Sequence, residues 1–265
     1  MAKILVCNPE FYGIEYSINP WMSVENQADR KLAIKQWTNL IDILKSIGVE
    51  VFEMSGEKNL PDIVFTANAG VYIKEKYLRP DGQPMGQVYL SNFRHPERQR
   101  EREHYAKFLI KLGYDCVKFP DDIYFEGAGD CLTFDGDMYC GYGFRSDVST
   151  YDFFSERKHI LKLVNPYFYH LDTCFCPLPK GMALIYPPAF EDVSSIRLKL
   201  LVVPENEAKH FACNAVCIDN NVIIPSNCPE TTKLLEDAGF KVYSTDMSEF
   251  IKAGGACKCL TLRLD

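Results

Sequence analysis

The stretch Cys131-Leu-Thr-Phe-Asp-Gly-Asp-Met-Tyr-Cys140 decides the fold class, because it has the pattern of a β-hairpin that turns at Asp135-Gly136. Asx-Gly pairs adopt the left-handed backbone that a two-residue hairpin turn requires. Two later stretches have the same form: Cys174–Ile185, turning at Lys180-Gly181, and Ala215–Ile224, turning at Asn220-Asn221. The hairpins begin about 40 residues apart, a period typical of propellers and related repeat arrays.

Helical and β patterns surround these hairpins. Apolar residues three and four positions apart predict helices at Asn26–Ile47, Pro96–Leu112, Asp152–Leu163 and Glu230–Ala238. The first helix carries its apolar stripe on Ala33, Ile34, Trp37, Leu40, Ile41, Leu44 and Ile47. Short β runs are expected at Ile4–Cys7, Val51–Met54, Ile63–Phe65, Val71–Ile73, Val88–Leu90 and Val117–Phe119. The pattern predicts an α/β chain, residues 1–265 as one domain, built of hairpin–helix–strand units. A plain α/β domain with several hairpins is the alternative.

Composition narrows the class of protein. Of 265 residues, 47% are hydrophobic, which suits a globular chain with a large core. The net charge is −7 with both signs mixed along the chain, which argues against a nucleic-acid or anionic-membrane partner. The first residues run into a strand rather than a signal peptide, and no apolar stretch is long enough to span a membrane. The 11 cysteines, an odd number, indicate reduced thiols and a cytoplasmic location.

Three stretches place reactive groups beside glycine or at a strand end. The first, Tyr124-Phe-Glu-Gly-Ala-Gly-Asp130, holds a carboxylate at a Gly-rich bend that a ligand could approach closely; the alternative is a tight turn with solvated acids. The second, Tyr169-His-Leu-Asp-Thr173, would place His170 and Asp172 on one face of a strand. A histidine beside an acid suits acid–base catalysis, but taken alone the stretch favours the alternative, a core histidine hydrogen-bonded to its neighbour.

The third stretch is Ala253-Gly-Gly-Ala-Cys-Lys-Cys-Leu-Thr261. A cysteine after a Gly-rich bend can be both exposed and activated as a nucleophile. Two structural thiols, or a Cys-x-Cys metal site, are the alternatives, but no Cys-x-x-Cys or paired histidines support zinc. Together the stretches supply a carboxylate, a His-x-Asp pair and a cysteine, which need only meet in space to act as one site.

This ordered set resembles the guanidino-group-modifying superfamily, the pentein fold, from Pro61 to Leu262. Its members include arginine deiminases, dimethylarginine dimethylaminohydrolases, arginine dihydrolases and amidinotransferases. The resemblance implies a five-fold pseudo-symmetric α/β propeller of ββαβ units around a central site. It also implies hydrolysis of a guanidinium C–N bond through a covalent cysteine adduct, with no metal or organic cofactor. The implied partner is a small-molecule substrate, arginine or a derivative, and the family analogy suggests a homo-oligomer.

The resemblance assigns roles to individual residues. Cys259 matches the nucleophile, with Cys257 as the alternative; Ala256 stands where the family has a third glycine. His170 matches the general acid/base, and Glu126 the carboxylate that holds the guanidinium and orients the histidine. The substrate-binding matches are Asp172, a second guanidinium carboxylate; Asp62 and Asn68, in the first site strand; and Arg98 and Arg145, which would grip the substrate's α-carboxylate, with Arg94 as the alternative to Arg98.

Asn68 favours one member of the family. Deiminases usually carry Asp at this place, whereas arginine dihydrolases resemble this chain in having Asn. Citrulline, the product of one hydrolysis, has a neutral ureido group, and an amide can hydrogen-bond it as donor and acceptor. An ionised Asp would be desolvated with no cation to pair with. The sequence therefore favours an arginine dihydrolase that yields ornithine, carbon dioxide and ammonia.

Alternatives remain within and outside this activity. Methylarginine hydrolases resemble the chain in size and in the arginine elements but usually lack an acid after the His-Leu pair, where Asp172 stands. Deiminases, which stop at citrulline, and the longer transferases are further alternatives. The superfamily also has a ribosome-binding translation initiation factor, which lacks the Cys, His and acid set and would be expected to carry a basic patch.

Overall fold

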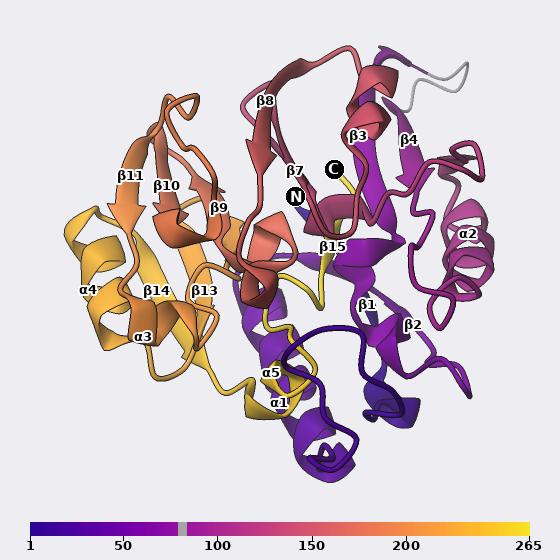
Figure 1. The fold of residues 1–265 in the computed structure, drawn as a ribbon, viewed down its shortest axis with the longest axis horizontal. Helices are drawn as coiled ribbons and strands as arrows, with labels where there is room; N and C mark the ends of the chain where they lie inside the picture. The colour runs from indigo at the N-terminus through magenta and orange to yellow at the C-terminus, as the bar shows by residue number, and fades with distance from the viewer. Residues whose placement is uncertain (79–83) are drawn as a thin grey trace.

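In the computed structural model, which describes residues 1–78 and 84–265, five three-stranded sheets follow one another around a ring (Figure 1). In every sheet the middle strand pairs antiparallel with one neighbour and parallel with the other. This is the predicted five-fold α/β propeller. The sheets, in hydrogen-bonded order, are β15 (Leu262–Arg263), β1 (Lys3–Cys7), β2 (Glu50–Met54); β3 (Gly70–Leu78), β4 (Pro84–Leu90), β5 (Asp115–Val117); β6 (Cys131–Phe134), β7 (Asp137–Tyr142), β8 (Arg157–Lys162); β9 (Phe175–Leu178), β10 (Met182–Ile185), β11 (Lys199–Val202); and β12 (Val216–Ile218), β13 (Asn221–Pro225), β14 (Lys241–Thr245).

The two ends of the chain close the ring. The last strand, β15, pairs antiparallel with β1, so that Ile4 faces Arg263 and Leu5 faces Leu262. Figure 1 accordingly shows the two termini near each other at the centre of the ring. One sheet therefore contains both the first and the last strand, and the C-terminal segment before β15 is drawn to the axis of the propeller.

Helices connect the middle and last strands in three of the five units: α1 (Arg30–Ser46), α2 (Glu101–Lys111) and α4 (Pro229–Asp237). Two shorter helices are α3 (Glu205–Ala208) and α5 (Ser248–Ile251). The start of α1 is set by Asp29, whose carboxylate accepts from the backbone N–H of Lys31 and Leu32. The predicted apolar stripe is buried at Trp37, Leu40 and Leu44, but Ile34 is exposed.

Several predicted elements were wrong or shifted. The helix predicted at Asp152–Leu163 is a short 3₁₀ turn, Val148–Phe153, followed by β8. Alternate burial of His159 and Leu161 shows the two-residue period of a strand, and parallel pairing with β7 outweighs the helical spacing. The strand predicted at Ile63–Phe65 is a buried 3₁₀ turn, Pro61–Val64, whose proline fixes the first φ angle.

Smaller shifts occur at element ends. Residues 96–100 form a turn, so α2 begins later than predicted, at Glu101. The strand β5 ends at Val117, before Phe119. The third hairpin turns at Asp219-Asn220, one residue earlier than predicted, because Ile218 pairs with Asn221. The other two hairpins turn as predicted, with positive φ at Asp135 and Gly136 and at Lys180 and Gly181.

Candidate active site

The chemistry-bearing stretches meet in one narrow pocket of about 10 Å³. Each lies just before the first strand of a sheet, where the chain enters the centre of the ring. The pocket is lined by Ile18, Asn19, Asp62, Phe65, Asn68, Arg98, Arg145, Tyr169, His170, Ala253, Gly254 and Cys259. Six of the eight predicted site residues are in this lining, and the other two, Glu126 and Asp172, contact His170 and Cys259 directly.

Glu126 and Arg145 surround one side of His170. A carboxylate oxygen of Glu126 lies 3.2 Å from His170 Nε2 and accepts from Arg145 Nη1 at 3.1 Å. All three side chains are buried. Burial opposes the charge on Glu126, but the Arg145 guanidinium and His170 hold its pKa well below the usual value. Glu126 is therefore a fixed anion that orients the imidazole.

His170 meets a second carboxylate, Asp130, on its other ring nitrogen. The Nδ1 atom lies 3.1 Å from Asp130 Oδ1, although the angle is poor for a hydrogen bond. Asp130 Oδ2 accepts from Ser146 Oγ at 2.6 Å, which fixes the carboxylate. Burial alone would lower the pKa of His170, but the two carboxylates raise it to about 9. At neutral pH the ring is protonated and able to donate to a leaving group.

Gly129 makes this arrangement sterically possible. A Cβ atom there would lie 2.4 Å from Asn68 Nδ2 and 3.1 Å from His170 Nδ1. The Gly-Ala-Gly bend of the sequence therefore lets Asn68 and His170 approach the chain that carries Glu126.

Cys259 faces Asp172 and Asn214. Its sulfur lies 3.6 and 3.7 Å from the two carboxylate oxygens of Asp172 and accepts from Asn214 Nδ2 at 3.1 Å. Burial and the Asp172 charge raise the thiol pKa well above its usual value, against the lowering effects of Ala256 N–H, Asn214 and Lys258. The thiol is thus protonated without a ligand, and a cation placed beside it would favour the thiolate.

Cys257, the alternative nucleophile, does not line the pocket. It belongs to an apolar cluster with residues such as Trp37 and Phe250, and burial raises its pKa far above the usual value. Its environment is that of a structural thiol.

Asp62, Asn68 and Arg98 form another part of the pocket lining. Tyr16 Oη donates to Asp62 Oδ2 at 2.9 Å, whereas the buried Asp62 Oδ1 has no hydrogen-bond partner in the described part of the chain. Asn68 accepts from Arg98 Nη1 at 3.0 Å and donates to the backbone oxygen of Glu126 at 2.9 Å. A buried carboxylate oxygen with no partner, in the wall of a pocket, suits a cationic ligand.

The arginines differ in how many of their N–H groups already make hydrogen bonds. Arg98 uses four of its five N–H groups on Glu101, Asn68 and the backbone of Asp62. Arg145 uses two, on Glu126 and the backbone oxygen of Ile18, and stacks on the Tyr169 ring at 4.7 Å. Arg94, the alternative to Arg98, is absent from the lining and pairs with Asp147. The α-carboxylate role of Arg98 and Arg145 stays a prediction.

The local geometry around His170 differs from the predicted strand. His170 precedes a 3₁₀ turn, Leu171–Thr173, so it does not share a strand face with Asp172. The turn arises because the N–H groups of Thr173 and Cys174 bond back to the carbonyls of His170 and Leu171. His170 consequently contacts Glu126, while Asp172 contacts Cys259. The sequence had also given no role to Asp130, Asn214 or Tyr16.

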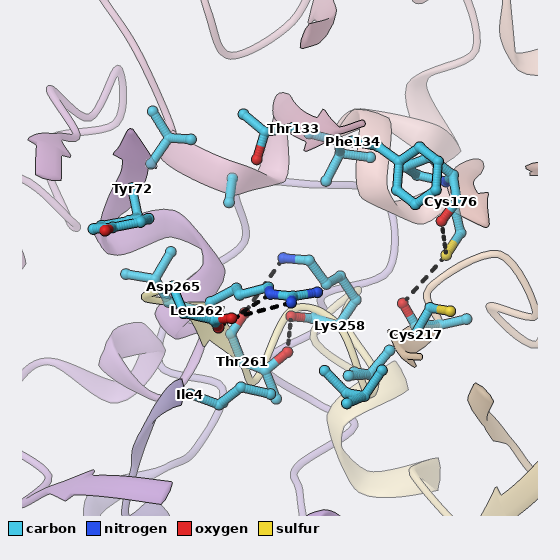
Figure 2. Close-up of a pocket in the computed structure, with 18 of the residues that line it drawn as sticks. Ile4, Tyr72, Thr133, Phe134, Cys176, Cys217, Lys258, Thr261, Leu262 and Asp265 are labelled. Atoms are coloured by element: carbon cyan, nitrogen blue, oxygen red, sulfur yellow. Dashed lines mark hydrogen bonds and ion pairs between the residues drawn. The ribbon is translucent and has the colours of Figure 1, made fainter. Parts of the chain in front are cut away.

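A larger cavity, of about 480 Å³, adjoins the nucleophile segment (Figure 2). Lys258 and Thr261 are on its wall together with Ile4, Phe134, Cys176 and Cys217. The cavity is lined by none of the predicted catalytic residues, which lie in or beside the narrow pocket instead. Among the described residues, no group of three or more His, Cys, Asp or Glu is arranged to hold a metal, and no helix has the length and hydropathy to span a bilayer.

Comparison with known proteins gives a consistent family. The model for eukaryotic N,N dimethylarginine dimethylhydrolases matches residues 5–264. The bifunctional arginine dihydrolase/ornithine cyclodeaminase ArgZ of Synechocystis is 40% identical over 99% of this chain, and the chain spans 37% of its length. The N(G),N(G)-dimethylarginine dimethylaminohydrolase of Mycobacterium tuberculosis is 33% identical over 97% of this chain and 83% of its own length. A crystal structure of the N-terminal domain of ArgZ, covalently bonded to a reaction intermediate, superposes with a TM-score of 0.89 at 38% identity, covering 100% of this chain and 98% of that domain.

Proposed function

The chain belongs to the dimethylarginine dimethylaminohydrolase family, and we propose that it is an arginine dihydrolase, which converts arginine and two waters to ornithine, carbon dioxide and two ammonia. The observation that carries the proposal is the pocket itself. A cysteine and a protonated histidine line it, the Asp62, Glu126 and Asp172 carboxylates line or adjoin it, and an amide, Asn68, stands among them. Residues 1–265 would act as one catalytic unit.

The carboxylates account for substrate binding. A guanidinium is planar and cationic, and carboxylates in a dry pocket hold it by paired hydrogen bonds. Asp172 adjoins Cys259, and the buried Oδ1 of Asp62 has no hydrogen-bond partner among residues 1–78 and 84–265. A cation bound there lowers the pKa of the Cys259 thiol, whose proton then passes to solvent. Binding of arginine thus generates the nucleophile for the first hydrolysis.

Each hydrolysis takes two steps. The Cys259 thiolate forms an S–C bond to the guanidinium carbon, giving a tetrahedral adduct. His170 donates its proton to a terminal nitrogen, the C–N bond breaks, and ammonia leaves. His170, now neutral, takes a proton from a water that attacks the carbon. The new C–OH group then loses its proton to solvent as the S–C bond breaks, which releases citrulline and the thiolate. Glu126 stabilises the charged imidazole at the first step.

Asn68 supports the second hydrolysis. It lines the pocket and donates to the Glu126 backbone oxygen, with Nδ2 lying 3.4 Å from His170 Nε2. An amide at this place can retain the neutral ureido group of citrulline, whereas a carboxylate would be desolvated without a cation. Retained citrulline passes through the same cycle to ornithine, carbon dioxide and the second ammonia. The similarity to ArgZ agrees with this assignment.

A second candidate is hydrolysis of dimethylarginine to citrulline. The matched family model and the Mycobacterium tuberculosis relative favour it. Asp172 argues against it, because a methylated nitrogen has fewer protons to offer a carboxylate, which would be left short of donors.

Product analysis tests the proposal. The purified protein is incubated separately with arginine, citrulline and dimethylarginine, and the products are identified by mass spectrometry. We expect ornithine and two equivalents of ammonia from arginine, and ornithine from citrulline. In Asn68→Asp, citrulline should accumulate from arginine. Citrulline as the end product of the wild-type protein, or unchanged ornithine release by Asn68→Asp, would contradict the dihydrolase assignment.

A further inference from the structure

The five units of the propeller contribute to the pocket in the same way. In four of them, the residues just before the first strand include predicted site residues: Asn68 before β3, Glu126 before β6, His170 and Asp172 before β9, and Cys259 before β15. In the remaining unit, the corresponding stretch before β12 holds Asn214, two residues from Val216, as Asn68 lies two residues from Gly70. The repeat therefore directs attention to a residue with no recognisable motif.

Asn214 holds the nucleophile segment through one oxygen. Its side chain is fully buried, and its Oδ1 accepts from the backbone N–H of Ala256, Lys258 and Cys259 at 3.1, 3.0 and 3.1 Å. Its own backbone oxygen also accepts from Lys258 N at 3.2 Å. Three N–H groups converging on one buried acceptor define the turn that presents the Cys259 side chain.

The amide nitrogen of Asn214 contacts the reacting atom. Its Nδ2 donates to Cys259 Sγ at 3.1 Å and to the backbone oxygen of Asp172 at 3.0 Å. Within residues 1–78 and 84–265, no other side chain donates a hydrogen bond to this sulfur. We propose that Asn214 is a further catalytic residue, which positions the nucleophile segment and stabilises the Cys259 thiolate by donating its amide N–H to the sulfur.

Asn214 and Asp172 favour opposite states of the sulfur. The thiol can donate to the Asp172 carboxylate at 3.6 Å, whereas the thiolate can only accept, and Asn214 is the donor placed to serve it. The other charged or titratable groups that act on the sulfur are Lys258, from the same segment, and the phenol of Tyr169. When a cationic substrate neutralises Asp172, the Asn214 bond remains to hold the thiolate.

The Asn214→Asp variant tests the donor separately from the acceptor. It keeps an oxygen for the three backbone N–H groups but places a negative oxygen where the N–H was. The rate of Cys259 alkylation by iodoacetamide, a neutral probe of the thiolate, is measured against pH, with the labelled cysteine identified by peptide mass spectrometry. We expect the midpoint to rise by at least about one pH unit, so that alkylation at neutral pH slows roughly tenfold or more. The kcat for arginine should fall roughly 10²-fold or more with little change in KM.

Glu207→Gln is the matched control. Glu207 is also buried and joins two segments, accepting from Glu230 N, Thr231 N and Thr231 Oγ1 at 2.7, 2.7 and 2.6 Å. This isosteric exchange should lower the melting temperature while leaving the alkylation midpoint and kcat unchanged. An unchanged alkylation midpoint and a kcat within twofold of wild type in folded Asn214→Asp would overturn the proposal. Asn214→Ala, which removes the donor without adding charge, should shift the midpoint in the same direction.

The wild-type protein gives an independent test if both Asn214 variants fail to fold. One asparagine side-chain amide resonance should titrate with the midpoint of the Cys259 alkylation rate, and its absence would overturn the proposal. The proposal rests on the proposed function only in taking Cys259 as the nucleophile. Alkylation needs no substrate, so a protein that turns over no arginine but shows the predicted midpoint shift would refute the dihydrolase and retain the role of Asn214.

Discussion

Glu126 and Asp172 are both buried carboxylates beside the same pocket, yet their surroundings push their pKa values in opposite directions. Against burial, the Arg145 guanidinium and His170 hold the pKa of Glu126 well below its usual value. Burial raises the pKa of Asp172 to about 6, opposed by Lys258 and His170. The difference follows from the partners: the Arg145 guanidinium lies 3.1 Å from Glu126, whereas the Asp172 carboxylate is contacted by the neutral thiol of Cys259, at 3.6 Å.

This contrast separates two tasks. Glu126 stays charged whether or not a ligand is bound, so it can maintain the orientation and protonation of His170. The pKa of Asp172, about 6, lies close to neutrality, so its charge can respond to a cation in the pocket, and the pKa of the Cys259 thiol changes with it. We call Glu126 and His170 the fixed region, because their charges do not depend on a ligand, and Asp172 and Cys259 the adjustable region, because theirs do. The predictions below test each in turn.

The largest effect is expected at the nucleophile. Cys259→Ala removes the atom that forms the covalent bond, and kcat should fall roughly 10⁴-fold or more. Cys257→Ala removes a small buried side chain in an apolar cluster, so kcat should stay within about twofold and stability fall by about 1 kcal/mol. Steady-state kinetics and thermal melts measure both. Equal losses of kcat in the two variants would contradict the assignment of Cys259.

The next largest effects are expected when the negative charge of Glu126, in the fixed region, is removed. Glu126→Gln leaves the Arg145 guanidinium buried without its anion, which should cost roughly 3–5 kcal/mol of stability. His170 would keep Asp130 but lose its partner on Nε2, so kcat should fall roughly 10²- to 10⁴-fold. Urea unfolding and kinetics at saturating arginine measure the two effects. Wild-type kcat in a destabilised Glu126→Gln protein would show that Glu126 is structural alone.

The sequence predicted the repeat more reliably than the local geometry of the site. The hairpin turns at Asp135-Gly136 and Lys180-Gly181 are local chemistry and were located to the residue. The turn at Leu171–Thr173 was missed because its hydrogen bonds leave no apolar period. Strand β8 was missed because its parallel pairing with β7 is not encoded in its own spacing.

Asn214 shows why part of the site stayed hidden. The stretch Ala212-Cys-Asn-Ala215 has no glycine, carboxylate or histidine to draw attention. Its importance arises from contacts with residues more than 40 positions away, at Cys259 and Asp172. The eight residues that the motifs indicated are nevertheless together in space, since a motif around Gly or at a turn records the close approach that a site requires.

The charge of His170 predicts a pH dependence of stability. Its folded pKa of about 9 lies above the unfolded value near 6.5, so the folded state binds the proton more tightly. The resulting stability, about 3 kcal/mol from a shift of roughly 2.5 units, is present below pH 6.5 and is lost as pH rises through 9. Unfolding free energies of wild type should fall over this window, and those of His170→Asn should fall less.

The smallest effect is expected in the adjustable region. Asp172→Asn removes the charge that raises the thiol pKa, while an amide of the same shape remains 3.6 Å from Cys259 Sγ. More thiolate should then exist without a ligand, and iodoacetamide should alkylate Cys259 roughly tenfold faster at pH 7, given one unit of pKa change. The kcat for arginine should nonetheless fall, since the guanidinium loses a carboxylate. Faster alkylation of Cys259 together with a lower kcat would identify Asp172 as the group that couples thiolate formation to substrate charge. Slower alkylation would mean that Asp172 acts as the acceptor of the thiol proton instead.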